Sequence, residues 1–172
     1  MTLPELRGPR VRLRPPDHDA DASVLARLLS EPEVARWWHG PWDAERVRHE
    51  ILDAEPGWII ECDGVVAGWV QFSEETEPDY RHVALDISLG TAHQGRGLGP
   101  EALRTVIDHF AAAGHHRFTI DPAAHNDRAI RAYAKVGFRP VGVLRDYERG
   151  TDGTWHDGLL MDLLVSDLAP TL

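Results

Sequence analysis

Gln94-Gly95-Arg96-Gly97-Leu98-Gly99 is the stretch of sequence that decides the fold. It lies between an apolar segment that predicts a strand and a segment with helical periodicity. Its closely spaced glycines let the backbone approach a ligand, because no Cβ lies in the way. The first N–H groups of a helix have no partner within the helix, and the helix dipole favours anions there. The stretch therefore predicts a phosphate or pyrophosphate site, to which Arg96 can add positive charge.

Alternative roles for the glycine stretch are limited. A glycine-rich turn can be a plain turn without a ligand. A Walker-type phosphate loop is excluded, because the chain contains no G-x-x-x-x-G-K-[ST]. A dinucleotide fold is not expected either, because there is no G-x-G-x-x-G and no βαβ unit precedes the glycines.

The segments on both sides of the glycine stretch have the patterns of a mixed α/β protein. Farther towards the N-terminus, Asp63-Gly64 separates two apolar segments and predicts a hairpin, because both turn positions favour positive φ. The complete series predicts strands at 10–14, 57–62, 65–72, 80–89, 116–120, 138–144 and 155–165, helices at 17–29, 32–38, 43–54, 97–113 and 126–136, and an acidic loop at 73–79. We expect an α/β (α+β) fold with a mixed, mostly antiparallel central sheet flanked by helices.

Length and composition limit the classes of protein. The 172 residues fit one domain, 1–172, and contain no apolar run long enough to span a membrane. A net charge of −10 repels phosphate backbones, so nucleic acid is not an expected partner. The single cysteine, Cys62, is interpreted as a strand residue, and the histidines lack zinc-site spacing, so neither a disulfide nor a metal is expected. We expect a cytoplasmic protein; the oligomeric state, monomer or homodimer, is left open.

Two motifs resemble those of the GCN5-related N-acetyltransferases, the GNAT superfamily. Gln94-x-x-Gly97-x-Gly99 after a strand is similar to the acetyl-CoA pyrophosphate motif of that superfamily, and the segment from Asn126 to Phe138 looks like its second hallmark. The motifs have the expected order and spacing, and the resemblance covers nearly the whole chain. It implies the GNAT fold, with splayed strands that bind acetyl-CoA as the cofactor.

The resemblance also implies roles for single residues. The strand at 84–89 would splay from its neighbour, and the pantetheine arm would bind to backbone groups of Ile87, Ser88 and Leu89. Asn126 would lie near the cofactor and Tyr133 near the thioester sulfur. The residues of the pyrophosphate site would be Gln94, Gly95, Arg96, Gly97, Leu98 and Gly99.

Acetyl transfer to an amine needs a group that accepts a proton, because an ammonium has no lone pair. The candidate carboxylates are Asp86, in an otherwise apolar strand, and Asp121, at the end of the next strand. Burial would raise the pKa of Asp86. Either aspartate could instead cap or order a loop. Tyr133 could fill the core or, as the resemblance implies, protonate the departing thiolate.

A narrower resemblance rests on the paired tryptophans Trp37-Trp38 and on the segments 74–78, 85–89, 94–99, 121–126 and 128–131. These segments are similar to those of the aminoglycoside 6′-N-acetyltransferases, a family linked to antibiotic resistance. The resemblance implies that Asp86 is the catalytic base and that Asp121 contacts ammonium groups of the substrate. Cationic amines gain charge-assisted hydrogen bonds from carboxylates and stack on indole rings. Without the resemblance, the tryptophans could form a hydrophobic lid and the acidic run a solvated loop. The implied substrate-binding residues are Trp37, Trp38, Glu74, Glu75, Asp86 and Asp121.

A second resemblance is to ribosomal-protein N-terminal acetyltransferases. Leu13-Arg14-Pro15, Arg36-Trp37 and the segment 153–158 fit that group. A peptide α-amine would need fewer acidic contacts and an open groove. A third alternative is a non-catalytic acyl-CoA-binding sensor, against which Asp86 and Tyr133 together argue. We therefore expect an acetyl-CoA-dependent N-acetyltransferase whose acceptor is a cationic small-molecule amine.

Overall fold

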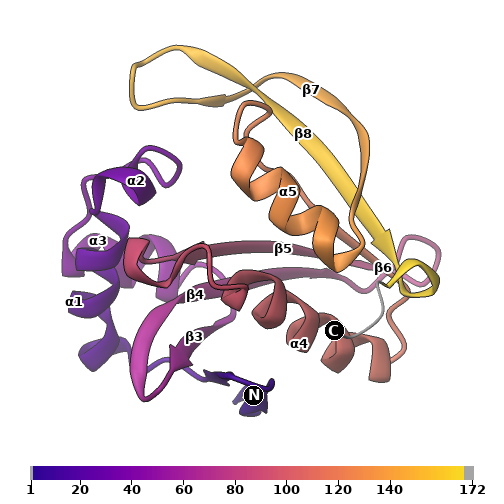
Figure 1. Ribbon diagram of the computed structural model, residues 1–172, viewed down its shortest axis with the longest axis horizontal. Coiled ribbons are helices and arrows are strands. Elements are labelled where there is room, and N and C mark those ends of the chain that lie inside the picture. The colour runs from indigo at the N-terminus through magenta and orange to yellow at the C-terminus, as the bar shows by residue number, and fades with distance from the viewer. Residues whose placement is uncertain (1, 169–172) are drawn as a thin grey trace.

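The computed structural model describes residues 2–168 and forms one mixed sheet with helices on both faces (Figure 1). Residue 1 and residues 169–172, which belong to the expected domain 1–172, lie outside this range. The strands are β1 (Leu6–Arg7), β2 (Val11–Arg14), β3 (Gly57–Cys62), β4 (Val65–Glu75), β5 (His82–Leu89), β6 (Arg117–Ile120), β7 (Arg139–Arg149) and β8 (Trp155–Leu164). The helices are α1 (His18–Leu29), α2 (Pro32–Ala35), α3 (Ala44–Val47), α4 (Leu98–Ala112) and α5 (Asp127–Val136), with a π-helical turn η1 (Arg48–Leu52) and 3₁₀ turns η2 (Thr91–His93) and η3 (Val165–Asp167).

In the described part of the chain, the strands are hydrogen-bonded in the order β1-β2-β3-β4-β5-β6-β8-β7. Neighbouring strands are antiparallel except β5 and β6, which are parallel. This arrangement confirms the predicted mixed, mostly antiparallel sheet. The turn between β3 and β4 has φ of +53° at Asp63 and +74° at Gly64, as the hairpin prediction required.

The helices are held by apolar stripes that pack on opposite faces of the sheet. Trp58 and Ile59 are neighbours in β3, so their side chains point to opposite faces, and both are fully buried. Trp58 packs in one core with the buried face of α4, whereas Ile59 packs in a second core with α1 and η1. Burying a large apolar side chain contributes roughly 1.5–3 kcal/mol. These two cores fix α4 and the α1–α3 segment on either side of the strands that carry the site.

Some predicted boundaries were wrong. The helix expected at 32–38 ends at Ala35, so Trp37 and Trp38 lie in the turns that follow it. The helix expected at 43–54 begins as α3 but continues from Arg48 as the π-helical turn η1. The expected acidic loop 73–79 begins later, because β4 continues its ladder with β5 as far as Glu75. No helix within residues 2–168 has the length and apolar character needed to cross a membrane.

Candidate active site

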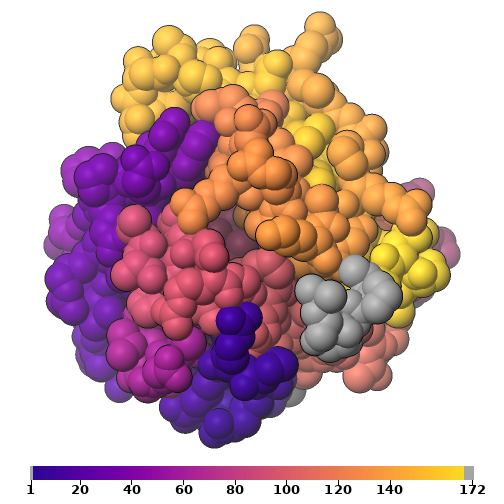
Figure 2. Space-filling view, in the orientation of Figure 1, coloured from indigo at the N-terminus to yellow at the C-terminus, as the bar shows by residue number. Residues whose placement is uncertain are grey.

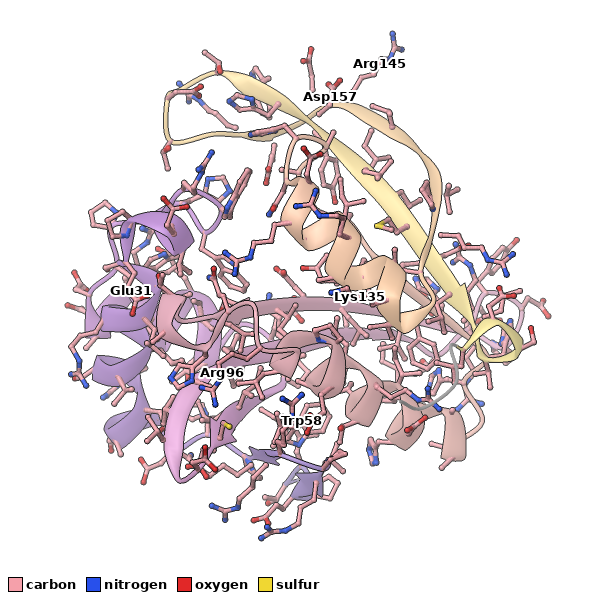
Figure 3. The ribbon with its side chains drawn as sticks, in the orientation of Figure 1. Glu31, Trp58, Arg96, Lys135, Arg145 and Asp157 are labelled. Carbon is pink, nitrogen blue, oxygen red and sulfur yellow. The ribbon has the colours of Figure 1, made fainter. Side chains whose placement is uncertain are left out.

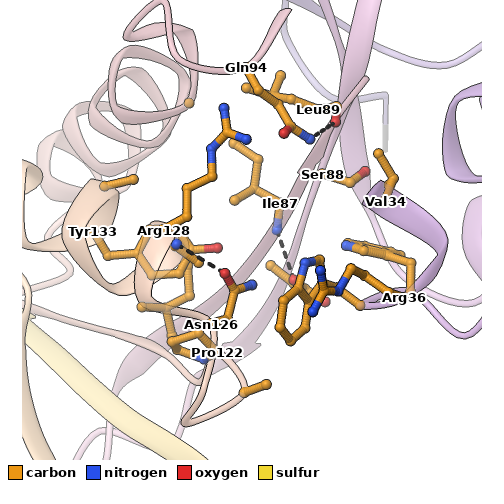
Figure 4. A pocket seen from close by; sticks show the side chains of 18 of the residues that line it. Val34, Arg36, Ile87, Ser88, Leu89, Gln94, Pro122, Asn126, Arg128 and Tyr133 are labelled. Carbon is orange, nitrogen blue, oxygen red and sulfur yellow. Dashed lines mark hydrogen bonds between the residues drawn. The ribbon is translucent and has the colours of Figure 1, made fainter. Parts of the chain in front are cut away.

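The strands β5 and β6 diverge and leave one edge of β5 without a strand partner. Their parallel pairing is limited to Val83 with Phe118 and Ala84 with Thr119, whereas β4 stays paired with β5 as far as Leu89. The N–H of Ile87 donates instead to the carboxylate of Asp86, at 2.9 Å (Figure 4). This divergence confirms the predicted splay and gives a ligand access to backbone groups of β5.

The glycine stretch connects β5 to the N-terminus of α4. Gly97 is the N-cap of α4 and adopts φ +79°, which an L side chain rarely tolerates. Because Pro100 has no N–H, the free donors of the first helical turn are those of Gly97, Leu98 and Gly99. The side-chain amide of Gln94 donates to the Leu89 carbonyl at 2.8 Å and so closes the loop on β5 (Figure 4). This arrangement is a helix N-terminus suited to bind an anion.

Helix α5 forms the opposite wall of the same cleft. Its N-cap is Asn126, whose Oδ1 accepts from the N–H of Ala129 at 3.2 Å. Its Arg128, Arg131 and Lys135 follow one another at helical spacing and all line the cleft. Lys135 lies on the side of α5 that faces α4 (Figure 3). We name the part of the cleft between these cations and the glycine stretch the loop end.

The cleft has a volume of about 980 Å³ and is visible as a hollow between the start of α4 and α5 (Figure 2). It brings together most of the site residues predicted from the sequence, although they come from distant segments. These residues are Trp37, Trp38, Asp86, Ile87, Ser88, Leu89, Gln94, Gly95, Gly97, Leu98, Gly99, Asp121, Asn126 and Tyr133.

Three predicted site residues do not line this cleft. Arg96 is exposed and lies on the outer side of the loop, where its carbonyl accepts a hydrogen bond from Arg10 (Figure 3). Glu74 and Glu75 lie at the far end of β4, opposite Val83 and His82 of β5. Glu74 contacts the Nε2 of the buried His115 at 2.7 Å. The acidic run therefore does not wall the cleft, because antiparallel pairing carries this end of β4 away from the free edge of β5.

The other end of the cleft, which we name the acidic end, contains Asp86, Asp121 and Glu148. Asp86 is accessible to solvent within the cleft, and protein surrounds the cleft around it. This partial burial and the charges of Asp121 and Glu148 raise the pKa of Asp86 to about 7, against the opposing effect of the hydrogen bond from Ile87. Asp86 is therefore a carboxylate that changes its protonation near neutral pH.

Two tyrosines keep their protons beside these carboxylates. Tyr133 is buried, and desolvation together with the negative charges of Asp86 and Asp121 raises the pKa of its phenol. The hydroxyl of Tyr147 donates a hydrogen bond to Asp121 Oδ2, which raises the pKa of Tyr147 to about 12. Both phenols are therefore proton donors at neutral pH.

Sequence reasoning missed several residues of the acidic end. Tyr147 and Glu148 belong to β7, which was expected to end at Leu144 but continues past a register shift to Arg149. Gln71 lies opposite Asp86 in the β4–β5 ladder, and its Oε1 accepts from the indole of Trp69 at 2.9 Å. The only signal for Gln71 was a polar residue inside an apolar strand, and the position of Glu148 depends on the register shift.

Aromatic side chains connect the two walls above the acidic end. The rings of Trp37 and His125 lie 5.0 Å apart, and Nε2 of His39 lies 3.5 Å from Glu148 Oε2. The guanidinium of Arg36 lies 4.6 Å from the centre of the Trp37 ring. The contact of His39 joins the segment after α2 to the β7–β8 hairpin, which extends towards α2 in Figure 1, and the contact of Trp37 joins it to the loop before α5.

Splayed strands, an anion-binding helix start and a carboxylate that titrates near neutral pH together define an acyl-CoA-dependent acyltransferase site. The Acetyltransferase (GNAT) domain model matches residues 10–139. The chain therefore belongs to the GNAT acetyltransferase family, and it is an acetyl-CoA-dependent N-acetyltransferase. The residues of the loop end fit this cofactor, because unpaired N–H groups and three cations suit its phosphates.

Proteins that are similar to this chain are named for different acceptors. The chain is 32% identical to the [Ribosomal protein uS5]-alanine N-acetyltransferase of Escherichia coli K12, over 89% of this chain and 87% of that protein. It is 26% identical to the spermidine N(1)-acetyltransferase of the same strain, with 88% and 84% covered. It is 27% identical to the aminoglycoside N(6′)-acetyltransferase type 1 of Klebsiella pneumoniae, with 72% of each covered. The structure of Mycobacterium smegmatis RimJ in complex with CoA-disulfide superposes with a TM-score of 0.77, at 25% identity, over 99% of this chain and 90% of that one.

Proposed function

We propose that the acceptor is a small amine with several positive charges, and that the 6′-amino group of an aminoglycoside antibiotic is the first candidate. The observation that carries the proposal is the cluster of Asp86, Asp121 and Glu148 at the acidic end of the cleft. Three carboxylates so close together disfavour one another's charge, and an ammonium placed among them relieves that cost. Charge-assisted hydrogen bonds to ammonium groups are roughly twice as strong as neutral ones.

Asp86 is the proposed catalytic base. Its pKa of about 7 leaves roughly half of the carboxylate ionised at neutral pH, and the ionised form can take a proton from the bound ammonium. An ordinary aspartate would be ionised but would be a much weaker base. Asp121, held by the hydroxyl of Tyr147, is proposed to bind a second ammonium group.

Acetyl-CoA supplies the acetyl group as a thioester. The N–H of Ile87 is the proposed donor to the oxygen that becomes negatively charged during transfer, because it lies on the free edge of β5 and is bonded only to the flexible Asp86 side chain. Tyr133 is the proposed acid for the departing thiolate, since its raised pKa keeps the phenol protonated. The loop end, where the Gln94–Gly99 stretch faces the cations of α5, is proposed to bind the pyrophosphate.

A second candidate acceptor is the N-terminal α-amine of a protein. Two observations favour it: the 32% identity to the uS5-alanine enzyme, and a cleft whose rim includes exposed residues such as Glu33 and Arg36. A peptide terminus carries one ammonium group next to the reacting carbon, so it would not need all three carboxylates of the acidic end.

Thiol release from acetyl-CoA with a panel of acceptors tests the proposal. The panel contains kanamycin, tobramycin, spermidine, a peptide with N-terminal alanine, and an aminoglycoside with a hydroxyl group at the 6′ position. We expect the highest kcat/KM with kanamycin or tobramycin and a large loss with the 6′-hydroxy compound. Release with the peptide and none with the polycations would transfer the proposal to the second candidate. Tight acetyl-CoA binding without release with any acceptor would support a non-catalytic sensor.

A further inference from the structure

The outer side of the glycine stretch is in contact with the N-terminal β1–β2 hairpin. The Nη1 of Arg10, the residue before β2, donates to the carbonyl of Arg96 at 2.8 Å. Its Nη2 lies against Gly97, 3.2 Å from the position that a Cβ would take there. The stretch is thus held from outside by a residue about 86 positions earlier in the chain.

Arg10 is itself fixed by Glu101, in the first turn of α4. Glu101 Oε1 accepts from the backbone N–H groups of Arg10 and Val11, at 2.5 and 2.8 Å, and Oε2 accepts from Arg10 Nε at 2.8 Å. The Glu101 side chain is only 11% exposed, whereas that of Arg10 is 52% exposed. One guanidinium therefore connects the start of α4 to the peptide that precedes it, with the fixed geometry that a planar fork provides.

This contact sets the direction of a neighbouring N–H group. The carbonyl of Arg96 and the N–H of Gly97 belong to one planar trans peptide and point in opposite directions. Because Arg10 holds the carbonyl on the outer side, the Gly97 N–H is turned to the inner side, where Gly97 lines the cleft. Arg10 therefore orients a donor of the loop end without entering the cleft.

Arg10 also compensates a charge. A carboxylate in the first turn of α4 would repel a phosphate bound at the same helix start. The guanidinium and the two backbone N–H groups neutralise Glu101 at that point. Loss of the guanidinium would therefore free the Arg96–Gly97 peptide to rotate. It would also remove the positive charge that offsets Glu101.

We infer that Arg10 is a positioning residue for the loop end, acting through the Arg96–Gly97 peptide and Glu101 on the affinity for the pyrophosphate of acetyl-CoA. The inference rests on the proposed role of the Gln94–Gly99 loop as the pyrophosphate site. It predicts a defect that is specific for acetyl donors that carry a pyrophosphate.

The experiment compares acetyl-CoA with S-acetylpantetheine, which carries the same thioester without the pyrophosphate and the nucleotide. We expect Arg10→Ala to raise KM for acetyl-CoA by roughly 5- to 20-fold with little change in kcat, the effect of losing a charged hydrogen bond that orients a donor. The kcat/KM for S-acetylpantetheine should stay within about twofold. The Ki of ADP as a competitive inhibitor should rise with the KM for acetyl-CoA, while Arg10→Lys should lie between wild type and Arg10→Ala.

Two further variants separate the inference from its alternatives. Arg7→Ala removes a 70% exposed arginine of the same hairpin that pairs with Glu5, and it should leave both donors unaffected. Gly95→Ala strains the loop at φ +73° from a side that Arg10 does not touch, and it should impair acetyl-CoA alone. If Arg10→Ala impaired both donors equally, or neither, its role would be structural and the inference overturned. If Gly95→Ala also affected the two donors alike, the proposal that the Gln94–Gly99 loop binds the pyrophosphate would itself be rejected.

Discussion

Replacing Asp121 by Asn should move the acid limb of the pH–rate profile to lower pH. With a pKa of about 7, Asp86 is roughly one-tenth ionised at pH 6 and nine-tenths ionised at pH 8, so kcat/KM should rise about tenfold across this range. After desolvation by the surrounding protein, the charge of Asp121 is the next largest cause of the raised pKa of Asp86. Removing one neighbouring charge across a solvated cleft is worth on the order of 1–2 kcal/mol. Asp86 would then be about half ionised at pH 6, and the rise would shrink to about twofold.

The assay is thiol release at subsaturating acceptor from pH 5.5 to 8.5, with one acceptor for all variants so that ionisation of the amine itself contributes equally. Glu75→Gln is the matched control, because it removes an exposed carboxylate at the far end of β4, outside the cleft. Its profile should coincide with that of the wild type. The reasoning that neighbouring carboxylates raise the pKa of Asp86 would be refuted by either of two results. One is a wild-type profile whose acid limb lies below pH 5, and the other is an Asp121→Asn profile whose acid limb coincides with that of the wild type.

Two further predictions concern the reacting groups. Tyr133→Phe should lower kcat by about 10- to 100-fold while calorimetry detects almost unchanged acetyl-CoA affinity, since the phenol is proposed to act only on the departing thiolate; unchanged turnover would make Tyr133 structural. Asp86→Asn should lower kcat/KM by about 10²–10⁴. The same variant should change stability in a pH-dependent way. Because the pKa of Asp86 is higher in the folded state than in the unfolded state, the stability of the wild type falls as pH rises from about 4 to 7. The variant lacks this effect, so its Tm relative to wild type should increase over that range. A constant Tm difference would contradict the raised pKa.

The sequence predicted those parts of the fold and site that depend on local chemistry. Apolar segments next to turn signals located β3 and β8 to within a residue, and the Asp63-Gly64 pair located the turn between β3 and β4. Five of the six residues predicted from Gln94 to Gly99 line the loop end, because they form one continuous stretch at a helix start, whereas the three cations of α5 were not predicted as site residues. Such local patterns predict structure well, because they do not depend on how distant strands pair.

The acidic end could not be predicted in the same way. It depends on the β4–β5 register, which puts Gln71 opposite Asp86 and carries Glu74 out of the cleft. It also depends on the register shift in β7, which brings Tyr147 to Asp121. A shift of one residue in a strand exchanges the two faces of a sheet, and a single sequence does not state where such a shift occurs.

This difference explains why the cofactor is easier to assign than the acceptor. Divergence of β5 from β6 creates two ends of one cleft. The loop end is made by the glycine stretch and one face of α5, whereas the acidic end draws on four separate segments, near Trp37, Asp86, Asp121 and Glu148. Substitutions in any of these segments can change the acceptor without disturbing the helix start that suits a phosphate. Relatives of similar identity that are named for spermidine, a ribosomal protein and aminoglycosides fit that arrangement. The charge of the acidic end, rather than overall similarity, is therefore the physical basis for choosing a polycationic acceptor.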